Sequence, residues 1–252
     1  MQLDLFFLII LFFSGIMAGF VDSIAGGGGI ITLPALLAVG IDPHHALATN
    51  KLQSSFGSFT SAFNYARVGL MNPKELLIGV ISTLIGAATG AIIVQQFNAH
   101  SLVSLIIVML IAIFIYTLLT PNLGMVKKEH KIPHTLFYTI FGLIIGFYDG
   151  FFGPGTGNFW TMALVLLLGL DLKAATAQTK LFNFTSNIVS LVIFIYSGLV
   201  IWTAGLIMGV GQIIGAFLGS TLVHKKEVKF IRIFFLIVVA LTIIKLIYQY
   251  YF

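Results

Sequence analysis

Long apolar runs separated by short polar loops dominate this sequence and limit the folds open to it. Only 8% of the 252 residues are charged and 59% are hydrophobic, whereas an average soluble domain is about one quarter charged. The chain therefore lacks the polar residues to cover a soluble fold, and we expect an all-α polytopic membrane protein. Eight runs approach the roughly 20 residues that a membrane-spanning helix needs: 3–20, 46–66, 75–97, 101–119, 135–152, 174–197, 200–223 and 230–250.

Two shorter apolar runs, 30–39 and 158–168, each follow a glycine-rich segment. At 1.5 Å per residue, each covers only about half of a hydrocarbon core roughly 30 Å thick. We expect both runs to be half-helices. Each would form a broken pair with the helix before it, either as a re-entrant hairpin or as two full passes.

Basic residues cluster in loops between the apolar runs, so they report on topology rather than on nucleic-acid binding, despite a net charge of +5. The positive-inside rule places these loops in the cytoplasm and the N-terminus outside. The clusters comprise Lys127, Lys128 and Lys131; Lys225, Lys226, Lys229 and Arg232; and the weaker pair Arg67 and Lys74.

An internal repeat divides the chain. Residues 19–22 match 146–149 at an offset of 127 positions, and residues 46–52 match 175–181 at an offset of 129. We assign residues 1–120 to a first repeat, 121–134 to a cytoplasmic basic linker and 135–252 to a second repeat. Each half contributes a glycine-broken helix pair and three transmembrane helices. It crosses an odd number of times, which predicts two inverted-topology repeats, as in many secondary transporters.

An acidic residue precedes each glycine-rich break, Asp22 in one half and Asp149 in the other. Acids inside a membrane protein are costly and by default indicate function, but each could instead cap the backbone at the break. A half-helix that starts inside the membrane offers free N–H groups and partial positive charge to an anion. Close helix packing is the alternative role for glycine. The predicted backbone site comprises Gly26, Gly27, Gly28, Gly29, Gly153, Gly155, Thr156 and Gly157.

Lys51 and Lys180 occupy equivalent positions in the two halves. Counted from a helix start at Asp42-Pro43, Lys51 lies about 13 Å deep. Either lysine could form a salt bridge with Asp22 or Asp149 that only holds helices together. The polar neighbours of both lysines indicate a polar inner face instead, so we expect at least one lysine to bind an anion directly. Neighbours assigned to the same site are Asn50, Gln53, Thr179 and Asn183.

The sequence offers little for other chemistry. It has no cysteine, its six histidines have no convincing metal-site spacing, and no nucleophile–base pair is evident. The glycine runs lack the Gly-Lys-Ser/Thr ending of a phosphate-binding loop. We therefore predict neither an enzyme nor a cofactor-binding protein.

Four segments together resemble the TauE/SafE sulfite exporter family, also called the toluenesulfonate uptake permease family: residues 18–25 with the glycine run after them, 47–55, 146–157 and 179–187. The resemblance covers nearly the whole chain. It implies a duplicated, bacterial-type inner-membrane transporter for sulfur-containing or organic anions such as sulfite, sulfonates or sulfoacetate. The family's motif lysines and glycines fall on Lys51, Lys180 and the two glycine runs.

These observations favour a secondary transporter that binds a small anion at the midplane, with proton coupling through Asp22 or Asp149 as a further possibility. A passive anion channel is the alternative. Saturable, gradient-driven accumulation would favour the transporter, and ohmic current at high unitary rates would favour the channel.

Overall fold

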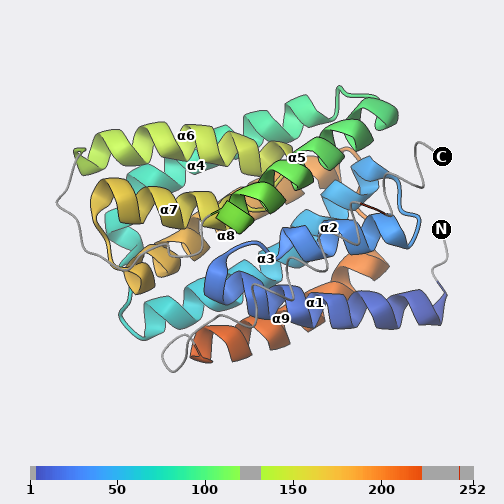
Figure 1. Cartoon of the computed structure of the whole chain (residues 1–252), viewed down its shortest axis with the longest axis horizontal. Coiled ribbons are helices and arrows are strands. Elements are labelled where there is room, and N and C mark those ends of the chain that lie inside the picture. The colour runs from blue at the N-terminus through green and yellow to red at the C-terminus, as the bar shows by residue number, and fades with distance from the viewer. Residues whose placement is uncertain (1–3, 120–131, 223–243, 245–252) are drawn as a thin grey trace.

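The computed structural model describes residues 4–119, 132–222 and 244 (Figure 1). Regular structure in these residues is helical throughout. By length and composition, four segments could cross a membrane: Leu5–Ile24, Pro73–Val94, Leu172–Tyr196 and Trp202–Leu222. The helices are α1 (Leu5–Ala25), α2 (Gly29–Ala38), α3 (Pro43–Arg67), the 3₁₀ turn η1 (Pro73–Leu76), α4 (Leu77–Val94), α5 (Ala99–Leu119), α6 (His134–Phe151), α7 (Thr156–Leu168), α8 (Leu172–Tyr196) and α9 (Trp202–Leu222).

The two predicted half-helices are present as α2 and α7, and they have 10 and 13 residues. The helix start predicted at Asp42-Pro43 is also confirmed, because the Asp42 carboxylate accepts a hydrogen bond from the His44 N–H and Pro43 is the first helical residue. α6 begins at His134, the last residue of the predicted linker and one residue before the predicted span 135–152. The span predicted at 230–250 and the basic clusters at 127–131 and 225–232 lie outside the described residues, apart from Ile244.

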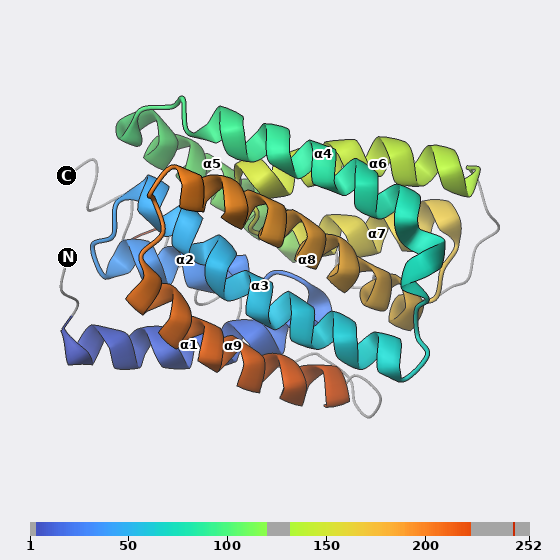
Figure 2. The same ribbon diagram turned by 180° about the vertical axis from the view of Figure 1, so that it is seen from behind.

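The helices lie side by side along the long axis of the molecule but run in two directions (Figures 1 and 2). α1, α3 and α9 run away from the end that holds the N-terminus, and α4, α6 and α8 run toward it. We call this the N-terminal end and the other the opposite end. α1 stops near the middle, where α2 turns back to the N-terminal end. α6 and α7 form the same kind of hairpin from the opposite end, so both broken pairs return to the end from which they came.

Glycines bring two helix pairs into backbone contact, α1 with α9 and α4 with α6. A Cβ atom on Gly19 would lie 2.4 Å from the Gln212 carbonyl oxygen, and one on Gly146 would lie 2.7 Å from the Thr83 carbonyl oxygen. Real Cβ atoms do not come so close to a backbone oxygen, so these contacts require glycine. These glycines therefore allow close packing of helices, a common role of small residues between membrane helices.

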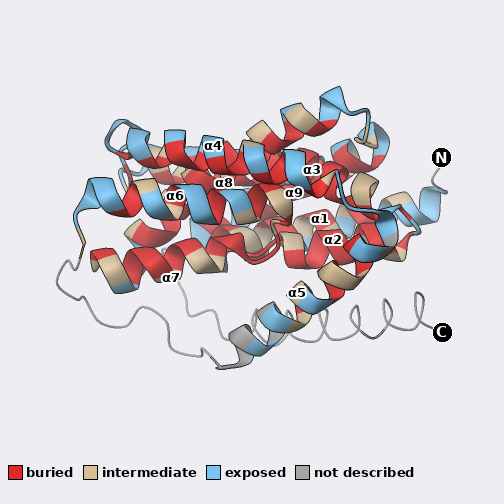
Figure 3. Cartoon of the chain, turned by 90° about the horizontal axis from the view of Figure 1, so that it is seen from above, coloured by how far each residue is buried: buried red, intermediate tan, exposed pale blue. Residues whose placement is uncertain are grey.

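The described residues bury polar side chains among apolar ones at the centre and expose large apolar side chains on the outside; Figure 3 shows which residues are buried. Large apolar side chains such as Ile81 and Phe217 are exposed on the outer helices, whereas α3 and α8 bury polar residues at the centre. The buried polar residues of α3 include Thr49, Asn50, Lys51, Gln53, Ser55, Ser58 and Ser61, and those of α8 include Thr176, Thr179, Lys180, Asn183, Thr185, Ser186, Asn187 and Ser190. This confirms the polar inner face, and it places α3 and α8 at the core of any site.

Candidate functional site

The two glycine-rich breaks touch each other at the centre of the molecule. Gly26 has φ +73°, and Gly155 has φ +82°, a conformation that glycine adopts without the steric penalty of a side chain. A Cβ atom on Gly157 would lie only 2.6 Å from the Gly26 Cα atom. The N-termini of α2 and α7 consequently start from one shared point, and glycine is what allows the two backbones to meet there.

Asp22 caps the first break. Its Oδ1 atom accepts hydrogen bonds from the backbone N–H groups of Gly27, at 3.0 Å, and Gly28, at 3.3 Å. Asp149 has no such role in the second break, because Pro154 stands where the first half has Gly27 and offers no N–H. The two acids are equivalent in sequence but differ in their contacts.

Two ion pairs connect the halves crosswise. Lys51 Nζ lies 2.7 Å from Asp149 Oδ1, and Lys180 Nζ lies 3.1 Å from Asp22 Oδ2. Each lysine therefore pairs with the acid of the other repeat. The lysine side chains are 1% and 0% exposed, and burial of this kind requires a counter-charge.

The two ion pairs differ in strength of contact. Lys51 donates to both the carboxylate and the backbone carbonyl of Asp149, and the Ser186 hydroxyl donates to the other carboxylate oxygen. Lys180 Nζ approaches Asp22 without hydrogen-bond geometry and has no hydrogen-bond partner in the described part of the chain. The Asp149 side chain is 5% exposed and that of Asp22 is 16% exposed. The Lys51–Asp149 pair is thus fully engaged, and the Lys180–Asp22 pair is not.

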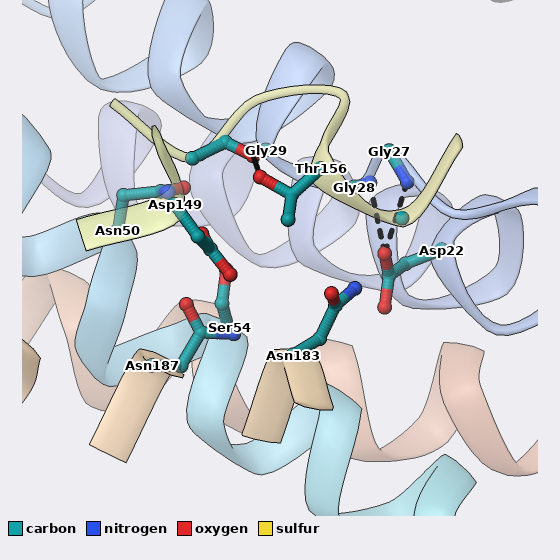
Figure 4. Close-up of a pocket in the computed structure, with 12 residues that line it drawn as sticks. Asp22, Gly27, Gly28, Gly29, Asn50, Ser54, Asp149, Thr156, Asn183 and Asn187 are labelled. Carbon is teal, nitrogen blue, oxygen red and sulfur yellow. Dashed lines mark hydrogen bonds between the residues drawn. The ribbon is translucent and has the colours of Figure 1, made fainter. Parts of the chain in front are cut away.

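A polar cavity of about 330 Å³, counted with the open space at its mouth, lies against the breaks (Figure 4). α3 and α8 supply amide and hydroxyl groups to its wall, and the two breaks supply backbone. The lining residues are Asp22, Gly27, Gly28, Gly29, Asn50, Ser54, Asp149, Gly153, Thr156, Gly157, Asn183 and Asn187.

Several polar groups at this cavity lack partners. Among the described residues, the backbone N–H groups of Gly29 and Gly157 have no acceptor. Asn183 is 6% exposed, and its side-chain oxygen accepts no hydrogen bond from the described residues. Buried polar groups are normally hydrogen-bonded, so the cavity is suited to a polar ligand.

The sequence matches the sulfite exporter TauE/SafE family over residues 11–246. This chain belongs to the TauE/SafE family. Probable membrane transporter protein YfcA of Escherichia coli strain K12 is 44% identical over 240 residues, which cover 95% of this chain and 89% of that protein. A probable membrane transporter protein of Haemophilus influenzae is 38% identical over 249 residues, 99% of this chain and 98% of that protein. The family and these relatives are membrane transporters rather than enzymes.

The structure of this TauE/SafE protein brings ten of the sixteen predicted site residues to the cavity and places the other six around it. Gly26 and Gly155 belong to the breaks, and Lys51 and Lys180 lie behind the acids in the ion pairs. Gln53 donates to Asn50, Thr32 and Ser54, and Thr179 bonds within its helix and to Thr161. In the described residues, no group of three or more His, Asp or Glu side chains is placed to hold a metal ion.

Two cavity residues, Ser54 and Asn187, were not among the predicted site residues. The repeat carries a signal for Ser54, because the offset of 129 that relates Lys51 to Lys180 also relates Ser54 to Asn183. No comparable signal exists for Asn187, whose repeat partner Ser58 does not line the cavity. Comparison of equivalent positions in the two repeats therefore finds Ser54. Asn187 is found only once the structure shows where the cavity lies.

Proposed function

We propose that this protein is a secondary transporter for small anions, which bind in the central cavity between the two helix breaks. The observation that carries the proposal is the pair of unbonded N–H groups, on Gly29 and Gly157, at the abutting starts of α2 and α7. Helix N-termini attract anions through such N–H groups and their partial positive charge. The Asn183 amide lines the same cavity, and its NH₂ group can donate to an anion there, because no described residue fixes the orientation of the amide through its oxygen.

The proposed substrate class is supported by the family and by the polar lining of the cavity. Sulfur oxyanions, organosulfonates and small carboxylates are compact, and each presents several acceptor oxygens to N–H and hydroxyl donors. The lysines would take part once an anion competes with a carboxylate for them. A direct lysine–anion contact thus remains our prediction, and it requires that at least one ion pair opens.

Two inverted-topology repeats are part of the proposal. The supporting evidence is that a helix of each repeat packs on a helix of the other, through glycines at equivalent positions. Gly215 of α9 approaches the backbone of Ile16 and Phe20 on α1, and the equivalent Gly86 of α4 approaches Leu143 and Phe147 on α6. These helices exchange between the halves, because α1 packs on α9 and α6 packs on α4.

The helix directions support the inversion. α1 and α6 are repeat partners and run in opposite directions, as do α4 and α9 (Figure 2). A pseudo-two-fold axis across the bundle relates such halves, and alternating access can then arise when they exchange conformations.

The position of the cavity supports a state of this cycle in which the binding site is open toward one end of the molecule only. Asn50 lies in the first half of α3 and Asn187 in the second half of α8, so both lie toward the N-terminal end. Their repeat partners toward the opposite end, Thr179 and Ser58, are 0% and 1% exposed and do not line the cavity. We propose that this is the state facing the N-terminal end, and that Thr179 and Ser58 line the cavity in the other state.

We also propose that the N-terminal end faces outward from a bacterial inner membrane. Among the described residues, the lysines and arginines outside the core are Arg67, Lys74 and Lys173, and all three lie at the opposite end. The described helix ends that adjoin the basic clusters in the sequence, the start of α6 at His134 and the end of α9 at Leu222, also lie there. The positive-inside rule then assigns the opposite end to the cytoplasm.

The test begins with a thermal-shift screen of the purified protein against sulfite, sulfate, thiosulfate, taurine and sulfoacetate. An anion that stabilises the protein is then offered to proteoliposomes. We expect saturable, gradient-driven accumulation, and Gly157→Ala should abolish it because its Cβ would collide with Gly26. Ohmic current without saturation would show a channel instead, and no stabilisation by any anion would count against an anion site.

A further inference from the structure

We infer that Asp22 is a proton-binding site, and that protonation of its carboxylate releases Lys180 to bind the transported anion. The inference rests on the proposed anion site and deepens it, because it names the coupled ion and assigns different roles to the two ion pairs. Asp22–Lys180 is the pair that opens, and Asp149–Lys51 is the pair that holds the halves together.

Charge balance in the core requires a second ion. Of the charged residues that the structure describes, four lie in the core: Lys51, Lys180, Asp22 and Asp149. Their charges sum to zero. A monoanion that entered alone would leave one uncompensated negative charge in a low-dielectric site, which costs several kcal/mol. A proton taken up by a carboxylate restores neutrality, since the carboxylate and the proton form a neutral carboxylic acid.

The contacts select Asp22 rather than Asp149 as the acid that takes up this proton. Asp149 is held by the Lys51 ammonium and the Ser186 hydroxyl, so each of its carboxylate oxygens already accepts a hydrogen bond. Asp22 accepts from backbone N–H groups on Oδ1 only. Its Oδ2 faces Lys180 without a hydrogen bond, and its side chain is three times as exposed at the cavity, 16% against 5%.

The contacts likewise select Lys180 as the lysine that receives the anion. An ammonium has three donors, and Lys180 makes no hydrogen bond to any described residue although it is completely buried. Lys51, in contrast, donates to two oxygens of Asp149. Because the ion pair with Asp22 is the only polar contact of its ammonium among the described residues, Lys180 has the most to gain from an anion once that acid is neutral.

The other ionisable groups around Asp22 do not compete for the proton. Tyr65 on α3 lies near Asp22, but its hydroxyl donates to the Ser23 carbonyl at 2.8 Å and is therefore protonated. Asp149 of α6 lines the same cavity and is neutralised by Lys51. Within the described part of the chain, Lys180 of α8 is the remaining charged group that faces Asp22. We therefore assign the proton to Asp22 and the anion to Lys180, without a part for the other ionisable groups.

The experiment measures anion binding and proton uptake together. Purified protein in weakly buffered detergent solution is titrated with methanesulfonate and with thiosulfate, while a pH indicator records protons taken up. Sulfite is not used as a probe, because it carries a titrating proton of its own. We expect about one proton per bound methanesulfonate, the monoanion whose charge one proton balances; thiosulfate serves as a second binding probe. The apparent Kd should rise about tenfold for each pH unit wherever Asp22 is ionised before binding, since one proton is linked to one anion.

Matched variants of the two acids locate the proton. Asp22→Asn should bind the anion with no proton uptake and no pH dependence. Lys51→Met/Asp149→Asn removes both charges of the other ion pair, so the core still sums to zero and this variant should keep the uptake. Lys180→Met should bind at least tenfold more weakly at every pH. Proton uptake that persists in Asp22→Asn, or that is lost only in Lys51→Met/Asp149→Asn, overturns the assignment.

The same titration separates this inference from the proposed function. If wild-type protein binds an anion without proton uptake, the anion site stands and the proton-binding role of Asp22 is wrong. If neither probe binds at millimolar concentration, the anion site itself is contradicted, and so is the coupling of anion binding to proton uptake.

Discussion

The Lys51–Asp149 pair should hold the two halves together, and removing one partner should destabilise the protein strongly. The side chains are 1% and 5% exposed, and they are 2.7 Å apart. Breaking a buried ion pair by removing one partner costs about 3–5 kcal/mol, because the other charge stays buried without compensation. At about 2–4 °C per kcal/mol for a chain of this size, we expect Lys51→Met to lower the Tm by roughly 6–20 °C.

A double-mutant cycle isolates the pair itself. Lys51→Met/Asp149→Asn leaves no unpaired charge, so we expect its stability to return to within about 1 kcal/mol of wild type. Thermal unfolding in detergent can be followed by the emission of Trp160, which is 0% exposed. Lys173→Met, which changes an exposed lysine at the start of α8, is the control and should change stability by less than about 0.5 kcal/mol. Additive effects of the two core substitutions would refute the pairing.

Two further predictions concern the breaks and the cavity. Gly28→Val and Gly155→Val should abolish transport more than they lower expression. A side chain on Gly28 meets Ala18 and Asp22 at 2.9 Å, and Gly155 has φ +82°; normal transport in both would reduce the breaks to packing features. On this naturally cysteine-free chain, Asn187→Cys should react with an impermeant reagent from outside and Ser58→Cys should not, with Gln96→Cys and Lys74→Cys as outside and inside references. The reverse pattern would contradict the proposed open side and orientation.

Local features of the structure could be predicted from the sequence because they depend on neighbouring residues. The N-cap at Asp42, the first helical residue Pro43 and the two half-helices are set by short-range chemistry, and the structure has all of them. The acids beside the breaks could be recognised because charge inside a membrane is costly.

The partners of the lysines could not be predicted, because they depend on distant segments. The sequence allows Lys51 to pair with either acid. The structure pairs it with Asp149, 98 residues away, since the α6 break lies beside α3. The different capping of the two breaks was readable in principle, because Pro154 lacks the N–H that Gly27 offers to Asp22.

These local differences bear on the proposed alternating-access cycle, because they make the two ion pairs unlike. Two identical halves would hold both acids equally, and neither ion pair would open before the other. Here Pro154 removes a donor from the second break, and Ser186 supplies a hydroxyl to Asp149 where the first repeat has Gly57. Asp149 thereby accepts hydrogen bonds from the Lys51 and Ser186 side chains, whereas in the described residues Asp22 accepts them from backbone N–H groups and meets Lys180 through an ion pair alone. This difference is the reason that we propose the Asp22–Lys180 pair, and not the Asp149–Lys51 pair, as the one that responds to a ligand.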